Sequence, residues 1–545
     1  MRATRSVLGG LLPKLTMTTA MVLASCGAPP DDAGEVQTGA GAAIIPVTIT
    51  PDQRLAACKL DQRVKAGLVT PEICAGADIF FRETFGGNGR TCGSCHPASH
   101  NFTIDRTFIN NLFATHPEDP LFVFRNDPTH LAGLEREEFF FNGGILENVD
   151  GFGDPTHRFV GRSVPHVLSM ATSIAPDTTD LSTNPPRERT GWGGDGAPGT
   201  GTLREFLSGA IKQHYTKTLA RTLDTDFRDA LPKELDFTLA FQMNLGRLNE
   251  LNLDQVRLFD ADAELGRQAY IDPQRGRCNF CHFNGGANAQ LTGKNANFDT
   301  GVRFRPIFGG VGTTPDGVNI FDAGFGGANL TSPNITSFPR FPGDTILNGF
   351  GNNTFNTPPL IEFADTMPGF HNDSADTPEA VVAFYTGTEF RNSQASIDLV
   401  ARFGTQIAFS DADAARIARF IRVLNTALNL DMAKQRLNAA KTLASMFNNT
   451  KPELQTTLMT IALGDINDAL EDISPTNAGL QIQPFYPVTQ DRLALAKTEI
   501  QAGLAATTWQ VRKDRISNAV SRVENARDQI GSNITFQLGK GNVMF

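Results

Sequence analysis

Tyrosine, tryptophan and cysteine are scarce in this sequence. Its 545 residues include 4 Tyr, 2 Trp and 7 Cys against 40 Phe, which predicts a core packed largely with phenyl rings. The oxidisable rings are few enough to name: Tyr215, Tyr270, Tyr385, Tyr486, Trp192 and Trp509. Long apolar runs are missing as well, and a composition of 40% hydrophobic and 19% charged residues excludes a polytopic membrane protein.

Positive charge is also in short supply, because the formal net charge is -10 at pH 7. Nucleic acids are bound by basic surfaces that neutralise phosphates, so we expect no nucleic-acid partner. An acidic surface is compatible with a basic partner protein. The length is sufficient for roughly two to four domains with cores of their own.

Residues 1–25 have the pattern of a secretory signal. Arg2 and Arg5 precede an apolar stretch that ends in Leu-Ala-Ser-Cys at Cys26 and is too short to span a bilayer. This ending is similar to a bacterial lipoprotein box. We therefore expect an exported lipoprotein, periplasmic or associated with the outer membrane, that meets the membrane only through a lipid on Cys26. An ordinary signal peptide with an incidental cysteine is the alternative. Residues 26–50 are predicted to form a flexible tether.

Two Cys-x-x-Cys-His motifs are present, at Cys92–His96 and Cys278–His282. Two thiols at this spacing reach the two vinyl groups of one porphyrin, and the adjacent histidine coordinates its iron. Random placement of the same residues would give roughly 0.0015 copies of this pattern per chain. The sequence therefore predicts two covalently bound haems c, attached through Cys92, Cys95, Cys278 and Cys281, with His96 and His282 as iron ligands.

Two alternatives use the same cysteines. A zinc site built from both Cys-x-x-Cys pairs would leave the two histidines unexplained, and a thioredoxin-like site needs one pair in a βαβ context. Cys58 and Cys74 remain. In an oxidising compartment we expect a disulfide between them, with two unpaired buried thiols as the alternative.

Both motifs follow the same kind of segment, which indicates an internal repeat. A helical pattern at 75–85 and another at 263–272 each lead through a short loop into the motif. We expect a mainly α fold of two cytochrome c-like haem domains with long loops, at 51–255 and 256–430, plus a separate C-terminal helical appendix at 431–545. Further helices are predicted at 202–222, 231–246, 377–386 and 411–428, and extended loops at 283–360.

The order of these features resembles the bacterial di-haem cytochrome c peroxidase superfamily, which includes the methylamine dehydrogenase maturation enzyme and the haem-dependent rubber oxygenases. The resemblance covers about residues 75–428. The segments that carry it are GNGRTCGSCH (87–96), RSVPHVLSMA (162–171), GWGGDGAPGTGTLREF (191–206), GRQAYIDPQRGRCNFCH (266–282) and FNTPPLIEFADTMPGFHND (355–373) followed by TPEAVVAFY (377–385).

This resemblance implies a division of labour. The haem on His96 would react with hydrogen peroxide, and the haem on His282 would pass on electrons from a small donor protein or a quinol-linked donor. Trp192 would relay charge between them, although a buried core indole is the alternative. The resemblance also implies a calcium ion held by the backbone oxygens of Thr366 and Pro368.

One departure from the family concerns acid–base chemistry at the first haem. Family peroxidases have a Gln and a Glu after the Trp segment, whereas this sequence has Phe206 at about the Gln position and no Glu following. His214 is the candidate acid or base in that stretch, with a structural or solvated histidine as the alternative. His100, His116 and His130 could instead cap the first haem. An apolar pocket would suit dioxygen and an apolar substrate, and a non-enzymatic electron carrier is a third possibility.

The second departure concerns the iron of the second haem. Where family peroxidases have a Met fourteen residues after the histidine at His371, this sequence has Tyr385, as the maturation enzyme does. A tyrosinate ligand favours the ferric state, while a Met thioether raises the potential. We expect Tyr385 to bind this iron. His371 or Met367 are the alternatives, and Tyr385 could also simply pack beside Phe384.

Overall fold

The computed structural model describes residues 47–148, 159–176, 189–190, 202–302, 305, 355–447, 452–475 and 484–545. Two compact units divide the chain, Met1–Gly41 and Ala42–Phe545, and all described residues belong to the second. The predicted signal, Cys26 and Trp192 lie outside the described residues. Within these ranges the fold is mainly helical, as predicted, and no helix is long and apolar enough to cross a membrane.

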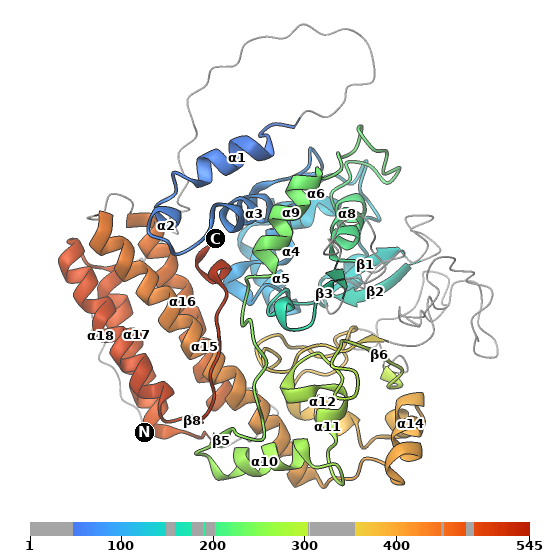
Figure 1. The fold of residues 1–545 in the computed structure, drawn as a ribbon. Helices are drawn as coiled ribbons and strands as arrows, with labels where there is room; N and C mark the ends of the chain where they lie inside the picture. The colour runs from blue at the N-terminus through green and yellow to red at the C-terminus, as the bar shows by residue number, and fades with distance from the viewer. Residues whose placement is uncertain are drawn as a thin grey trace, which may run out of the picture. The chain divides into compact units, whose positions relative to one another are not determined.

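The first half of the described chain surrounds the first motif and is coloured blue to green in Figure 1. Its helices are α1 (Pro51–Cys58), α2 (Gln62–Lys65), α3 (Pro71–Arg82), α4 (Cys92–Cys95), α5 (Arg106–Thr115), α6 (Val123–Asn126), α7 (Glu137–Phe140), α8 (Leu203–His214) and α9 (Pro232–Gln242). Its strands pair antiparallel as β1 (Gly144–Asn148) with β2 (Phe159–Ser163) and β3 (Ala175–Pro176) with β4 (Arg189–Thr190). A disulfide joins Cys58 in α1 to Cys74 in α3, as expected.

The second half surrounds the second motif. Its elements are β5 (Arg257–Leu258), α10 (Ala261–Ile271), α11 (Cys278–Cys281), β6 (Asn297–Phe298), β7 (Phe355–Asn356), α12 (Pro378–Phe384), α13 (Thr388–Arg391), α14 (Gln394–Phe403) and α15 (Asp411–Phe447). Caps set several of these boundaries. Thr377, for example, accepts a hydrogen bond from the Ala380 amide at 3.2 Å, and Pro378 occupies the first turn of α12, where its missing N–H costs nothing.

A close helix crossing in each half repeats in detail. In the first half, Gly76 of α3 lies against the backbone of Phe237 in α9, and one turn later Phe80 packs edge-on against Phe241. Glycine is required there because a Cβ on Gly76 would overlap the Phe237 carbonyl oxygen.

The same arrangement recurs in the second half. Gly266 of α10 lies against the Arg416 carbonyl of α15, and one turn later Tyr270 packs edge-on against Phe420. The predicted internal repeat at 75–85 and 263–272 is therefore observed as two equivalent helix crossings, each just before a Cys-x-x-Cys-His motif.

The C-terminal helices α15, α16 (Pro452–Ile473), α17 (Pro487–Leu504) and α18 (Trp509–Arg527) lie side by side, orange to red in Figure 1. Helix α15 has 37 residues and runs without a break through position 430, where the predicted second domain ends. The end of the chain returns to both halves. The Asn542 side chain accepts from the Gly246 amide of the first half at 2.7 Å, and β8 (Gly531–Ser532) pairs with β5 of the second half. The C-terminal region is thus continuous with both halves.

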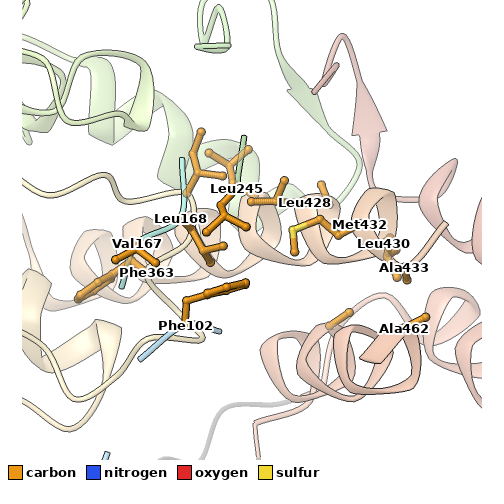
Figure 2. Packing of buried hydrophobic residues seen from close by; sticks show 14 of the residues in the cluster. Phe102, Val167, Leu168, Leu245, Phe363, Leu428, Leu430, Met432, Ala433 and Ala462 are labelled. Carbon is orange, nitrogen blue, oxygen red and sulfur yellow. The ribbon is translucent and has the colours of Figure 1, made fainter. Parts of the chain in front are cut away.

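One apolar core connects these regions. Figure 2 shows Phe102 and Val167 of the first half near Phe363 of the second, with Met432 of α15 and Ala462 of α16 in the same cluster. The central part of α15 is buried all round, which is typical of a helix in the middle of a core.

Two predicted helices differ from those observed. The helix predicted at 202–222 ends at His214, because threonine and aspartate side chains then form local bonds that compete with helix. The Thr216 hydroxyl donates to the Thr218 carbonyl at 2.6 Å, and Asp226 accepts from the Thr222 amide at 2.8 Å. The helix predicted at 411–428 instead extends to Phe447, since buried polar partners hold Asn425 and Asn429 inside it.

Candidate haem-attachment sites

Each motif forms a single helical turn, α4 or α11, that places its three functional residues. The His96 amide donates to the Cys92 carbonyl at 2.9 Å, and the His282 amide donates to the Cys278 carbonyl at 2.8 Å. The two cysteines are the first and last residues of this turn, and the histidine is the capping residue that follows it. The two sites therefore present the same local geometry.

The two histidines are oriented in the same way. Nδ1 of His96 lies 2.9 Å from the Phe102 carbonyl oxygen, and Nδ1 of His282 lies 2.9 Å from the Pro358 carbonyl oxygen. A carbonyl only accepts, so each Nδ1 carries the hydrogen and each Nε2 is left with its lone pair for a metal. Burial lowers the pKa of both imidazoles to about 4, which keeps them neutral as iron ligation requires.

The four motif cysteines are free thiols, unlike Cys58 and Cys74. Burial raises the pKa of Cys92 to about 11 and that of Cys95, Cys278 and Cys281 to about 12. Among the described residues, no group of three or more His, Cys, Asp or Glu side chains could hold a metal ion, so the zinc alternative has no site there.

A buried tyrosine accompanies each motif. The Tyr215 hydroxyl donates to Cys92 Sγ at 3.2 Å, and the Tyr270 hydroxyl donates to the His282 carbonyl at 2.6 Å. Three of the four tyrosines, including Tyr385, therefore lie at the two sites. Most buried aromatic residues of the described chain are phenylalanines, and Tyr215 and Tyr270 are found where the hydroxyl has a hydrogen-bond partner.

Buried charge surrounds the first site. Arg90, two residues before Cys92, donates to Glu135 Oε1 at 2.7 Å, and His214 Nδ1 lies 3.8 Å from the same oxygen. His214 is also close to the motif in the structure, because the side chain of Asn88, four residues before Cys92, donates to the His214 carbonyl at 2.9 Å. The acid–base role of His214 stays a prediction.

Glu135 was missed by the sequence interpretation. It lies 79 positions before His214, so no local spacing connects the two. Exposed or half-buried residues flank Leu134 and Glu135 on both sides, so the sequence around Glu135 carries no local signal that this carboxylate is buried.

The other three histidines proposed as caps for the first haem are paired elsewhere. His100 Nε2 lies 3.6 Å from Asp105, His116 Nδ1 lies 3.3 Å from Glu118, and His130 Nδ1 lies 3.0 Å from Asp127. His116 and His130 are exposed to solvent. Their short-range acidic partners indicate surface roles.

A cavity of about 300 Å³ adjoins the second motif. Cys278, Cys281 and His282 lie on its wall, and so do Tyr385, His371 and Met367, the three candidates for the remaining iron position. The cavity is lined mainly by aromatic and aliphatic side chains, including Phe298, Phe390, Leu399 and Ile407. A large apolar group with a polar centre fits this lining, so the residues present are suitable for a haem.

Tyr385 and His371 differ in their surroundings. The Tyr385 ring packs against Phe384 and Phe390, and burial followed by the Cys281 and Cys278 thiols raises the pKa of its phenol. The His371 ring is stacked on Phe355, with ring centroids 3.9 Å apart. Tyr385 lines the same cavity as Cys278 and Cys281, and its ligation of an iron stays a prediction.

Residues from the first half complete the wall of this cavity. Phe206 of α8 lies there, although the family pattern puts its counterpart near the first haem. His166, which the sequence interpretation did not single out, lies there too. Thr366 and Pro368 also line the cavity, and the calcium prediction remains one that rests on their backbone oxygens alone.

A buried ion-pair network joins the two halves beside the cavity. Arg247 donates from Nε to Glu362 at 2.9 Å and from Nη1 to Glu250 at 2.9 Å, and Ser169 donates to Glu362. Arg247 Nη2 has no hydrogen-bond partner among the described residues. A buried guanidinium nitrogen without a partner is costly, and a carboxylate of a bound haem would be a suitable acceptor.

Compared with protein-family models, with curated proteins and with solved structures, the chain shows no match.

Proposed function

We propose that the chain is an exported di-haem c-type oxidoreductase that reduces hydrogen peroxide at the first site with electrons delivered through the second. The observation that supports it best is the repeated histidine geometry, in which Nδ1 of both His96 and His282 is bound to a backbone carbonyl at 2.9 Å. When bound, each haem supplies an iron that exchanges single electrons. The proposal places this chain with the family that its sequence resembles.

The division of labour rests on what surrounds each motif. At the second site, Tyr385, His371 and His282 all line one cavity, which favours an iron with two protein ligands. At the first site His214 and Glu135 form a partly buried acid–base pair. Peroxide takes up two electrons and two protons to give two waters, so a group that holds and releases protons is needed there.

In this proposal Glu135 keeps a proton on His214 available. The Glu135 carboxylate lies 3.8 Å from His214 Nδ1, and Arg90 holds this carboxylate in place by donating a hydrogen bond of 2.7 Å. Phe206 stands at about the position where family peroxidases have a Gln. No side-chain amide is therefore available there, and His214 takes the acid–base role alone.

The remaining parts of the proposal concern location and partners. The Cys58–Cys74 disulfide supports export to an oxidising compartment, which agrees with a lipid anchor at Cys26. Trp192 as charge relay and calcium at Thr366 and Pro368 remain proposals from the family resemblance. The electron donor is a small protein or a quinol-linked donor.

Two measurements test the proposal. Mass spectrometry of the mature protein should find two covalent haems. The reduced protein should then be mixed rapidly with peroxide and, separately, with air. Fast oxidation with consumption of peroxide supports the peroxidase. A lasting spectral change in air without peroxide consumption supports the dioxygen-using alternative, and inertness to both supports a simple electron carrier.

Matched histidine variants test the role of His214. His214→Ala should slow peroxide consumption by about 10² to 10⁴, the usual contribution of a general acid–base group. His116→Ala is the control, because His116 is exposed and paired with Glu118. Equal rates in both variants would remove His214 from the mechanism while leaving the haem assignment intact.

A further inference from the structure

The backbone around His166 is bonded to both haem sites. The Thr103 hydroxyl donates to the Val164 carbonyl, and Thr103 follows Phe102, whose carbonyl accepts from His96. On the other side, the Ser163 amide donates to the His371 carbonyl at 2.7 Å. The segment therefore lies between the loop that orients the first iron ligand and the loop that lines the second site.

The His166 side chain lies at the same junction. It lines the cavity that also contains His282 and Thr103. Figure 2 shows its neighbours Val167 and Leu168 packed between Phe102 of the first half and Phe363 of the second. One buried imidazole thus lies on the wall of the second site, within the segment that is hydrogen-bonded to the loop of the first.

A polar ring at this position is not required by packing. His166 is 6% exposed, and the two residues that follow it, Val167 and Leu168, belong to the apolar core. Burying an imidazole costs free energy unless it is hydrogen-bonded, so an apolar residue would be the simpler filler. The surrounding residues do fix the ring. Nδ1 lies 3.3 Å from the Leu168 amide, so it accepts, and the hydrogen of the neutral ring is on Nε2.

Burial keeps His166 neutral. Burial lowers the pKa of His166 to about 4, with Arg247 lowering it further and Glu362 opposing this. The ring therefore holds one hydrogen at neutral pH and has no net charge. A neutral, fixed donor can lie between two redox centres without changing its own protonation when an electron passes.

We propose that His166 is a positioning residue of the electron path between the two haem sites. The inference rests on the proposed function, because it requires a haem at each motif. In the step concerned, one electron leaves the reduced second site and one arrives at the oxidised first site. His166 neither gains nor loses an electron or a proton. Its side chain and Thr103 line the same cavity, and Val164, two residues before His166, accepts from the Thr103 hydroxyl.

The test compares ring shape with hydrogen bonding. His166→Phe keeps a ring of similar volume and loses both nitrogens, whereas His166→Gln keeps an amide donor near the Nε2 position. Val167→Ala is the control, because it removes packing at the neighbouring position. Haem content is first measured by mass spectrometry. The two haems are then reduced rapidly to half of their capacity. The rate of electron transfer between them is measured from the change in their separate absorption spectra.

His166→Phe should slow transfer between the haems by about tenfold or more, equivalent to about 1.4 kcal/mol in the apparent barrier. His166→Gln should recover most of the rate, and Val167→Ala should leave it unchanged while lowering stability. If the Phe variant fails to take up both haems, His166→Leu takes its place with the same expected loss. A Phe or Leu variant as fast as the wild type overturns the inference and leaves the di-haem proposal standing. A wild-type protein without two haems overturns both.

Discussion

The segments at Cys92–His96 and Cys278–His282 share their backbone and differ in their surroundings. Each follows a helix crossing built on a glycine, Gly76 in one case and Gly266 in the other, with an aromatic ring one turn later. Each directs its histidine Nδ1 to a carbonyl at 2.9 Å. These shared features are what attachment and ligation by a single histidine require.

The surroundings then separate the two sites. Arg90, Glu135 and His214 place buried charge beside the first motif, whereas the second faces an apolar cavity of about 300 Å³ with Tyr385 on its wall. Charge that can hold a proton suits reaction with a small polar oxidant, and an apolar cavity with a second ligand suits storage and transfer of electrons. If both motifs bind haem as proposed, the comparison teaches that the motif sets the attachment of the cofactor and that residues far away in the chain set the different roles of the two sites.

The test with the largest expected effect removes one attachment site at a time. Cys92→Ser with Cys95→Ser should leave one covalent haem, and Cys278→Ser with Cys281→Ser should also leave one, each detected by mass spectrometry. Only the variant that keeps the first haem should still react with peroxide when electrons are supplied chemically. Peroxide reactivity in the variant that keeps only the second haem would reverse the assignment of roles.

The remaining cysteine pair provides the control. Cys58→Ser with Cys74→Ser should retain both haems and lose roughly 3 kcal/mol of stability, as expected for a disulfide that closes a loop of this size. Unfolding by urea, followed by circular dichroism, measures the loss.

The second test asks whether the two helix crossings are equivalent. Gly76→Ala and Gly266→Ala would each place a methyl group on a backbone carbonyl of the crossing helix, so each should destabilise its half by about 1 to 3 kcal/mol or more. Gly464→Ala is the matched control. Gly464 lies inside α16, and no atom lies within 4 Å of the place that an alanine methyl group would take, so alanine should stabilise the helix by up to about 1 kcal/mol.

Thermal unfolding monitored at the absorption of each haem would compare the crossings. In each glycine variant, we expect the unfolding temperature to fall only for the haem signal of the half that carries the substitution. If only one of the two variants is destabilised, the halves are not built on the same plan.

The sequence was most informative where function depends on local spacing. The two motifs, the repeat before them and the helices near 75–85, 231–246 and 377–386 could all be predicted, since periodicity and caps are local. His166 and Glu135 could not, because each gains its role from residues far away in the chain. The length of α15 was missed for a similar reason. The sequence did not show that the helix predicted at 411–428 joins the helical region predicted at 431–545, because Asn425 and Asn429 are held inside α15 by a carboxylate far away in the chain, Asp365.

The third test concerns the second site alone. Tyr385→Met should raise the reduction potential of the second haem on the order of 0.1 V, a modest part of the about 0.8 V that axial ligands span. A thioether stabilises ferrous iron, whereas a phenolate stabilises ferric iron. Spectroelectrochemistry measures the change, and the first haem serves as the internal reference.

Two further variants decide between the candidates at this iron. Tyr385→Phe should change the ferric spectrum while His371→Ala leaves it unchanged. The opposite pattern would make His371 the ligand, with its ring leaving the stack on Phe355 when haem is bound.

The smallest effect concerns the support that α16 gives to each half. Asp468 of α16 accepts from Asn101 of the first half at 3.1 Å, whereas Asp472 lies near Asp365, in the loop before Thr366 of the second. Asp472 is 2% exposed, and its Oδ2 has no hydrogen-bond partner among the described residues. Burial above all, and then the Asp365 carboxyl, raise the pKa of Asp472 well above its ordinary value, while Arg422 opposes this.

The sign of the pH dependence follows from that shift. Above about pH 4 the unfolded chain releases the Asp472 proton and the folded protein retains it, so stability falls as pH rises. Asp472→Asn keeps the shape without the titration. It should match the wild type near pH 4 and exceed it by about 1 to 3 kcal/mol at pH 8. Asp514→Asn, at an exposed position of α18, should change little at either pH. Urea unfolding at both pH values measures the difference, and a gain that is equal at pH 4 and pH 8 would show that Asp472 is ionised in the folded protein.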